Sequence, residues 1–96
     1  AAGSDVNAIF ENNSSLLYIC KRKQHSTRIA QLLIFAGADV NYSNSLNGIT
    51  PLMLAAKWNN LELVKSLMIA GADKNLVDAT GLTAKDYTKK KINMLD

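Results

Sequence analysis

The fold of this chain is decided by residues 48–75, which read Gly-Ile-Thr-Pro-Leu-Met-Leu-Ala-Ala-Lys-Trp-Asn-Asn-Leu-Glu-Leu-Val-Lys-Ser-Leu-Met-Ile-Ala-Gly-Ala-Asp-Lys-Asn. Thr50 followed by Pro51 is typical of a helix start, because the hydroxyl caps the helix and proline at the first helical position loses no hydrogen bond. Asn59 and Asn60 predict a tight break. The apolar residues Leu63, Val64, Leu67 and Met68 then follow helical spacing until Gly71 ends the helix. The stretch predicts a short helix, a turn and a longer helix.

The same pattern recurs along the chain. The triplet Gly71-Ala72-Asp73 has counterparts in Gly37-Ala38-Asp39 and Gly3-Ser4-Asp5, each 34 residues apart. A turn marker repeats as Asn13, Gly48 and Gly81, and a hydroxyl two residues later repeats as Ser15, Thr50 and Thr83. The spacings place single insertions near residues 43–46 and 24–26, where turns tolerate them. The chain is therefore built from repeated helix pairs.

None of these units can bury its own apolar stripe, and stacking one unit on the next buries it. The alternative is a plain small helical bundle in which the spacing is a coincidence. Three markers that stay in register disfavour that alternative. We expect a solenoid.

The stretch from Gly48 to Ala56, continued by Leu61–Val64 and Gly71–Asp73, resembles the ankyrin repeat. The resemblance implies an all-α solenoid of stacked helix-turn-helix units joined by β-hairpin-like loops. It divides one domain, residues 1–96, into the tail of a preceding repeat (1–8), two repeats (9–41 and 42–75) and a truncated final repeat (76–96).

The chain departs from the family pattern at several positions. Tyr18, Met53 and Asp86 stand where the family usually has histidine, so the resemblance implies that the usual hydroxyl-to-imidazole bond is missing. Lys85 stands at a position where a core leucine is usual. We therefore expect one face of the last helix to meet solvent.

Composition excludes most catalytic chemistry. With 96 residues, one cysteine and one histidine, the chain lacks the residues for an internal disulfide or a cysteine-rich zinc site. Cys20 is expected to be packed and His25 to lie in an exposed turn. The sequence therefore predicts no enzyme activity, no cofactor, no metal and no small-molecule substrate.

Location signals are also few. The longest apolar run, residues 32–38, is too short to span a bilayer, so no membrane association is expected. The first residues, Ala-Ala-Gly-Ser-Asp-Val-Asn-Ala, lack the features of a secretion signal. A cytoplasmic or nuclear location is expected.

Two short basic runs, residues 21–23 and 89–91, contribute to a net charge of +3. The simplest interpretation is a solvated surface, on which positive side chains near the end of a helix interact favourably with the helix dipole. The alternatives are nuclear import or an acidic partner. Nucleic acid is a minor candidate partner. Proteins that bind nucleic acid by stacking bases on aromatic side chains need several such residues on the surface, and this chain has one tryptophan.

The resemblance implies a non-catalytic module that binds another protein, with an acidic patch on that partner as one option, through loop tips and short inner helices. Carried over by position, the partner-binding surface comprises Glu11, Asn12, Arg22, Lys23, Leu46, Asn47, Ile49, Lys57, Trp58, Ala79, Thr80 and Leu82. The alternative is a structural repeat segment of a larger multidomain protein whose activity lies elsewhere.

Two surfaces follow from this arrangement. Trp58 is expected to face the concave groove as a binding anchor, and the alternative is that it packs locally over Asn59. Residues 1–8 are expected to carry no helix pair of their own, so Ile29, Leu33 and Phe35 are expected to be under-covered. This predicts either self-association through that face or a further repeat upstream.

Overall fold

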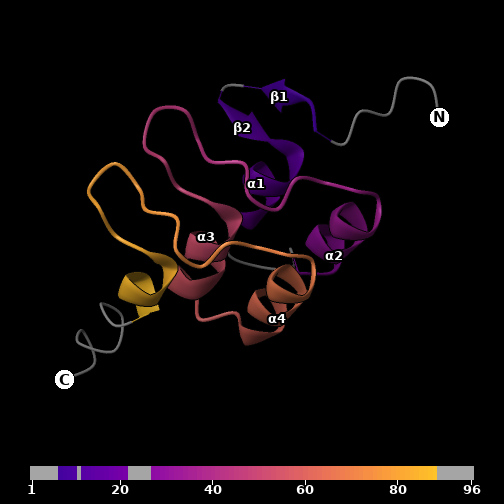
Figure 1. Ribbon diagram of the computed structural model, residues 1–96. Coiled ribbons are helices and arrows are strands. Elements are labelled where there is room, and N and C mark those ends of the chain that lie inside the picture. The colour runs from indigo at the N-terminus through magenta and orange to yellow at the C-terminus, as the bar shows by residue number, and fades with distance from the viewer. Residues whose placement is uncertain (1–6, 11, 22–26, 89–96) are drawn as a thin grey trace.

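The computed structural model describes residues 7–10, 12–21 and 27–88, and it consists of stacked helix pairs. The first pair is α1 (Ser15–Cys20) and α2 (Thr27–Phe35), and the second is α3 (Pro51–Lys57) and α4 (Leu61–Ile69). A further helical segment covers residues 84–88. A two-stranded antiparallel hairpin, β1 (Ile9–Phe10) and β2 (Asn13–Ser14), precedes α1 and pairs Ile9 with Ser14 (Figure 1). The predicted all-α solenoid is confirmed.

The core lies between the two pairs. Helix α1 packs on α3, and α2 packs on α4. The most deeply buried large side chains come from three of these helices: Leu16, Leu17, Cys20, Met53, Leu63 and Leu67. The pairs therefore bury each other's apolar faces, as a solenoid requires.

At the helix starts, other side chains take the place of the histidine that is usual at this position of the repeat. At α3 the Thr50 hydroxyl accepts from the Met53 amide at 3.3 Å, and the Met53 sulfur accepts from the Thr50 amide at 3.4 Å. At residues 84–88 the Asp86 carboxylate accepts from the amide and the hydroxyl of Thr83 at 2.9 and 3.1 Å. A reciprocal capping pair thus forms at both starts without histidine.

The predicted register of the first unit is wrong by one residue. The cap of α1 is Ser14, not Ser15, because the Ser14 hydroxyl accepts from the Leu17 amide at 3.1 Å. Asn12, not Asn13, adopts the left-handed conformation that Gly48 has in the next unit, with φ of 69° against 73°. Two adjacent serines and two adjacent asparagines left the sequence ambiguous here.

The shift changes which residues correspond. Leu17, not Tyr18, occupies the position of Met53, and Lys21 corresponds to Lys57. Tyr18 is accordingly exposed while Leu17 is buried.

The turns agree with the sequence-based predictions more closely than the first helix start does. Asn59 has a φ of 56° and breaks the chain between α3 and α4, as predicted, and Asn60 caps α4 by accepting from the Leu63 amide. Gly48 is fixed by its surroundings, because a Cβ there would lie 3.0 Å from the Ala79 amide nitrogen. The second and third loops therefore touch at a point that excludes a side chain.

An asparagine ladder joins successive units. Asn41 donates to the Gly71 carbonyl at 3.2 Å and accepts from the Asp73 amide at 2.7 Å. Asn7 makes the same two bonds one unit earlier, to the Gly37 carbonyl at 3.4 Å and from the Asp39 amide at 2.6 Å. The turns that follow the long helices are thus held in one repeated geometry.

Three smaller expectations can be compared with the structure. Cys20 is buried, and burial raises the pKa of its thiol to about 12, so the thiol is protonated and unreactive. Lys85 is exposed, as expected for the last helix. His25 lies outside the described residues.

We predict that Leu67→Ala lowers the free energy of unfolding by about 2–5 kcal/mol, because it opens a cavity between the two helix pairs. Leu67 is 0% exposed, whereas Leu32, on the solvent side of α2, is 61% exposed. Leu32→Ala is therefore the matched control and should cost less than about 1 kcal/mol. Urea unfolding followed by circular dichroism measures both, and equal costs would contradict the packing described here.

Candidate functional site

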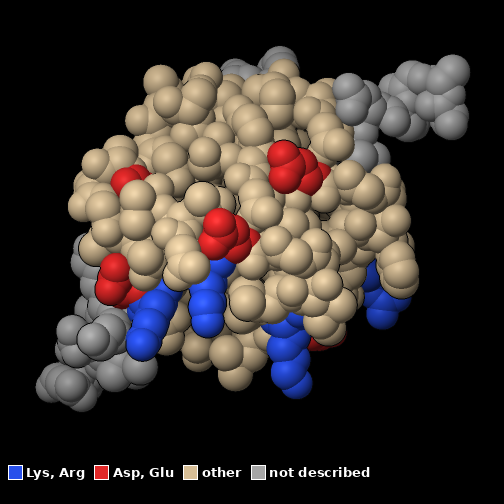
Figure 2. Space-filling view, in the orientation of Figure 1, with Lys and Arg blue, Asp and Glu red and all other residues tan. Residues whose placement is uncertain are grey.

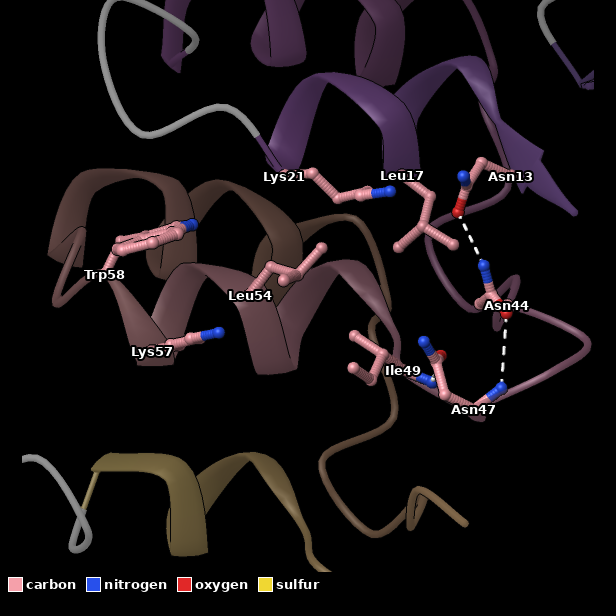
Figure 3. Close-up of a pocket in the computed structure, with 9 residues that line it drawn as sticks. All are labelled: Asn13, Leu17, Lys21, Asn44, Asn47, Ile49, Leu54, Lys57 and Trp58. Carbon is pink, nitrogen blue, oxygen red and sulfur yellow. Dashed lines mark hydrogen bonds between the residues drawn. The ribbon is translucent and has the colours of Figure 1, made fainter. Parts of the chain in front are cut away.

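A concave hollow of about 180 Å³ lies between α1, α3 and the loop that precedes α3. Its apolar wall consists of Leu17 from α1, Leu54 from α3 and Ile49 from the loop. Its other lining residues are amides and cations, with one aromatic ring (Figure 3). We call this hollow the groove. It spans both helix pairs.

The loop side of the groove is held rigid by Asn44. This buried side chain accepts from the Leu46 and Asn47 amides at 2.8 and 3.2 Å, and it donates to the Asn13 side chain at 2.8 Å. A backbone hydrogen bond from the Asn44 amide to the Ile49 carbonyl, at 2.9 Å, closes this loop. The groove therefore has a preorganised polar wall.

The opposite side of the groove is cationic and aromatic. Lys21 follows α1, and Lys57 and Trp58 close α3. Figure 3 shows both lysine side chains extending from these helix ends toward the apolar wall. The Lys57 Nζ lies 5.2 Å from the centre of the Trp58 ring, within range of a cation–π contact. No acidic residue is among those that line the groove.

The structure brings together four of the residues predicted for the partner-binding surface. Asn47, Ile49, Lys57 and Trp58 all line the groove. Trp58 is half-buried, so it lies in the groove without being part of the core.

The other residues predicted for the partner-binding surface lie on the loop tips or outside the described residues. Leu46 is exposed at the tip of the second loop. Residues 79–82, which include Ala79, Thr80 and Leu82, form the tip of the third loop, and Ala79 donates to the Asn47 carbonyl at 2.9 Å. Asn12, in the first hairpin, accepts from the Ser45 hydroxyl at 2.6 Å. Glu11, Arg22 and Lys23 lie outside the described residues.

The sequence did not lead us to predict Lys21, which gives the groove one lysine from each of the two inner helices. Nor did it lead us to predict the amides Asn13 and Asn44. The signal was present: once the helices are aligned by their caps, Ser14 and Thr50, Lys21 matches Lys57. The one-residue register error hid it.

The third loop is held by Asp78. Its carboxylate accepts from the Thr80 amide and hydroxyl at 2.8 and 2.6 Å, from the Leu82 amide at 3.0 Å, and from the Tyr87 hydroxyl at 2.5 Å. Burial alone would raise the pKa of Asp78, but these donors outweigh it and hold that pKa well below its usual range. Burial, the bond to Asp78 and its negative charge raise the pKa of Tyr87 to about 12.

Surface charge is unevenly spread. On the face shown in Figure 2, acidic side chains lie over the middle and the left, while lysine and arginine side chains gather along the lower edge. Within the described part of the chain, no three histidine, cysteine or acidic residues come together as a metal site. No helix there is long and apolar enough to cross a membrane.

Comparison with known proteins agrees with this geometry. A family model for ankyrin repeats in three copies matches residues 2–86. An ankyrin repeat protein of fowlpox virus is 29% identical over 92 residues, covering 86% of this chain and 48% of its own length. An ankyrin repeat-containing protein of Treponema pallidum is 34% identical over 89 residues, covering 93% of this chain and 30% of its own length.

A third relative is an ankyrin repeat and KH domain-containing protein of Caenorhabditis elegans, 36% identical over 75 residues. The match covers 78% of this chain and 3% of that protein. The chain thus spans about half or less of the length of these relatives. It belongs to the ankyrin repeat family, whose members generally act as protein-interaction modules and are generally not catalytic.

We predict that Asp78→Asn lowers the melting temperature near neutral pH and that the difference shrinks in acid. The folded pKa of Asp78 lies below the unfolded value near 3.9, so its stabilisation is complete above about pH 5 and is lost as pH falls toward the folded pKa. Thermal unfolding of both proteins from pH 7 to pH 2.5 measures the difference. A gap that stays constant over this range would show that the negative charge is not what holds the loop.

Proposed function

We propose that this chain binds a segment of another protein in the groove, and that the segment carries an acidic side chain beside an apolar one. The observation that carries the proposal is the pair Lys21 and Lys57, which line the groove together with an apolar wall and with no acidic residue among the lining residues. We infer no catalytic role for the groove, because it offers cations, amides and apolar side chains but no base beside a nucleophile.

The electrostatic part of the proposal follows from the two lysines. Each comes from the end of an inner helix, one from each helix pair, so a carboxylate in the groove would meet positive charge from two successive helices. The Asn47 side chain accepts from the Ile49 amide through its oxygen, which leaves its NH₂ group to donate to a ligand. Charge of this kind chiefly steers the encounter and selects the partner.

The apolar part of the proposal depends on Trp58. Aromatic rings at the centre of a patch are common binding hot spots, because they bury a large area with few rotatable bonds. The ring is half-buried beside Leu54, where a ligand side chain that fills the hollow would cover it. This supports Trp58 as the anchor of the site.

We predict that Trp58→Ala weakens binding of an acidic peptide by about thirtyfold, equivalent to about 2 kcal/mol, with little change in melting temperature. The probe is a fluorescein-labelled library of 12-residue peptides that combine Asp or Glu with one Leu or Ile, and anisotropy reports binding. Phe35→Ala is the matched control, since Phe35 is an exposed aromatic residue on α2 outside the groove. A large fall in melting temperature with unchanged affinity would make Trp58 a packing residue.

We predict that Lys21→Glu combined with Lys57→Glu abolishes selection of acidic peptides over their Asn and Gln counterparts. For the unmodified protein, raising the salt from 50 to 500 mM should slow association severalfold, because the lysines attract the ligand over a distance of about one Debye length. Lys65→Glu combined with Lys74→Glu is the matched control, because it makes the same change in charge at two exposed lysines outside the groove. If neutral and acidic peptides bind equally well to the unmodified protein, the acidic part of the proposal is wrong.

A second candidate is a structural role within a longer protein, which the short share of the relatives covered by this chain favours. In that case the groove variants would leave every interaction of the longer protein unchanged, while core variants such as Leu67→Ala would disrupt it. For either role we propose a cytoplasmic or nuclear location, which the single cysteine of the chain, free rather than in a disulfide, supports. Imaging of a fluorescent fusion tests the location.

A further inference from the structure

The apolar surfaces outside the groove are exposed as expected. Ile29 and Phe35 are 47% and 91% exposed. They line two separate hollows, one with Leu33 on the first helix pair and one with Ile69 between α2 and α4. Nothing among the described residues shows what would cover either hollow, whereas the loop before α3 contains a reactive pair of residues.

This pair is Asn47-Gly48, the only asparagine in the sequence that is followed by glycine. Asparagine deamidates most readily before glycine, because glycine has no side chain to hinder attack of its amide nitrogen on the asparagine side chain. Asn47 is exposed and lines the groove together with Lys21 and Lys57 (Figure 3). The reaction would therefore change the charge of the groove itself.

The side chain of Asn47 is held against its own backbone. Its Oδ1 accepts from the Ile49 amide at 3.0 Å, and the ring that this hydrogen bond closes includes the Gly48 nitrogen. The Ile49 amide would also stabilise the negative charge that develops on Oδ1 as the nitrogen attacks Cγ. The electrophile is therefore oriented and polarised in the folded chain.

The nucleophile, in contrast, is restrained. The Gly48 amide donates to the Asn44 carbonyl at 2.7 Å, and this bond must break before the nitrogen attacks. The third loop lies against the same two residues, because the Ala79 amide donates to the Asn47 carbonyl at 2.9 Å. A Cβ on Gly48 would lie 3.1 Å from the Asp78 Cα. The attack thus requires the second and third loops to separate first.

We propose that Asn47 is a site of spontaneous deamidation, and that the contact between the second and third loops sets its rate. The Gly48 nitrogen bonds to the Asn47 Cγ, its proton passes to solvent and ammonia leaves, which gives a cyclic succinimide. Water then opens the ring at either carbonyl and gives aspartate or isoaspartate. The net reaction converts an amide and water into a carboxylate and ammonium, with no oxidation or reduction.

The product changes the groove in two ways. Either carboxylate adds a negative charge to a site that is also lined by Lys21 and Lys57, where an acidic ligand would meet it. Isoaspartate also lengthens the main chain between Asn44 and Ile49, whose backbone hydrogen bond of 2.9 Å closes the loop. The effect on binding rests on the proposed function, whereas the reaction itself does not.

The rate is measured on the unmodified chain. The protein is incubated at pH 8 and 25 °C, either folded or unfolded in guanidinium chloride, and proteolysis followed by mass spectrometry reports conversion at Asn47. We expect conversion to be slower in the folded protein by about tenfold or more, since only molecules with the loops apart react. Equal rates in the two states would overturn the proposal, as would an unfolded chain in which Asn44 converts as fast as Asn47.

Asp78→Asn tests the role of the loop contact. Asp78 accepts the hydrogen bonds that shape the third loop, so the folded variant should convert at Asn47 severalfold faster than the unmodified chain. Asp73→Asn is the matched control, because Asp73 accepts from the Asn75 amide in the turn after α4, outside both loops. Equal acceleration by the two variants would show that the loop contact does not set the rate.

Binding separates this inference from the proposed function. Asn47→Asp supplies one product directly, and it should weaken binding of the acidic peptides about tenfold relative to Asn75→Asp, which adds the same charge outside the groove. If the unmodified protein binds acidic peptides and Asn47→Asp binds them equally well, the effect on the groove is wrong. If the unmodified protein binds none, the proposed function fails, and conversion at Asn47 is judged by mass spectrometry alone.

Discussion

The structure depends on the packing of one helix pair against the next. Neither pair encloses its apolar residues alone: α4, which carries the buried Leu63 and Leu67, packs on α2 of the first pair as well as on its own partner α3. At about 25 cal/mol per Å² of apolar surface, this interface is the main favourable contribution available to so short a chain. Everything else, including the loops that form the groove, is positioned by helices that this contact holds in register.

Polar contacts fix how the three loops lie relative to one another. Asn44 ties the second loop to Asn13 in the first, and the Ala79 amide ties the third loop to the Asn47 carbonyl. A bond of this kind contributes about 1 kcal/mol, but an unpaired buried amide would cost more, so the network strongly favours one loop arrangement. The apolar stack therefore supplies stability, and the amide network supplies the shape of the groove.

Much of this could be predicted from the sequence, and the exceptions have a common cause. Thr50-Pro51, the Asn59-Asn60 break and Gly71 carry local signals that depend on their own backbone, so the second unit was predicted correctly. In the first unit, Ser14 and Ser15 are equally good caps by residue type, and the structure places Ser14, the last residue of β2, at the cap. The capping role of the Met53 sulfur was missed for a related reason, because it depends on side-chain geometry rather than on residue pattern.

The same register determines the chemistry of the groove. With Ser14 as the cap, Lys21 and Lys57 occupy equivalent positions on successive inner helices, and their charges converge on one hollow. Because the groove is built from both helix pairs, a ligand that contacts Lys21 and Trp58 together binds only while the pairs remain stacked. By mass action such a ligand stabilises the stacked form, in proportion to the logarithm of its concentration over its dissociation constant. Binding of the proposed partner would thus be coupled to the packing of the solenoid through one interface, and any change that loosens the core beneath the groove would weaken it.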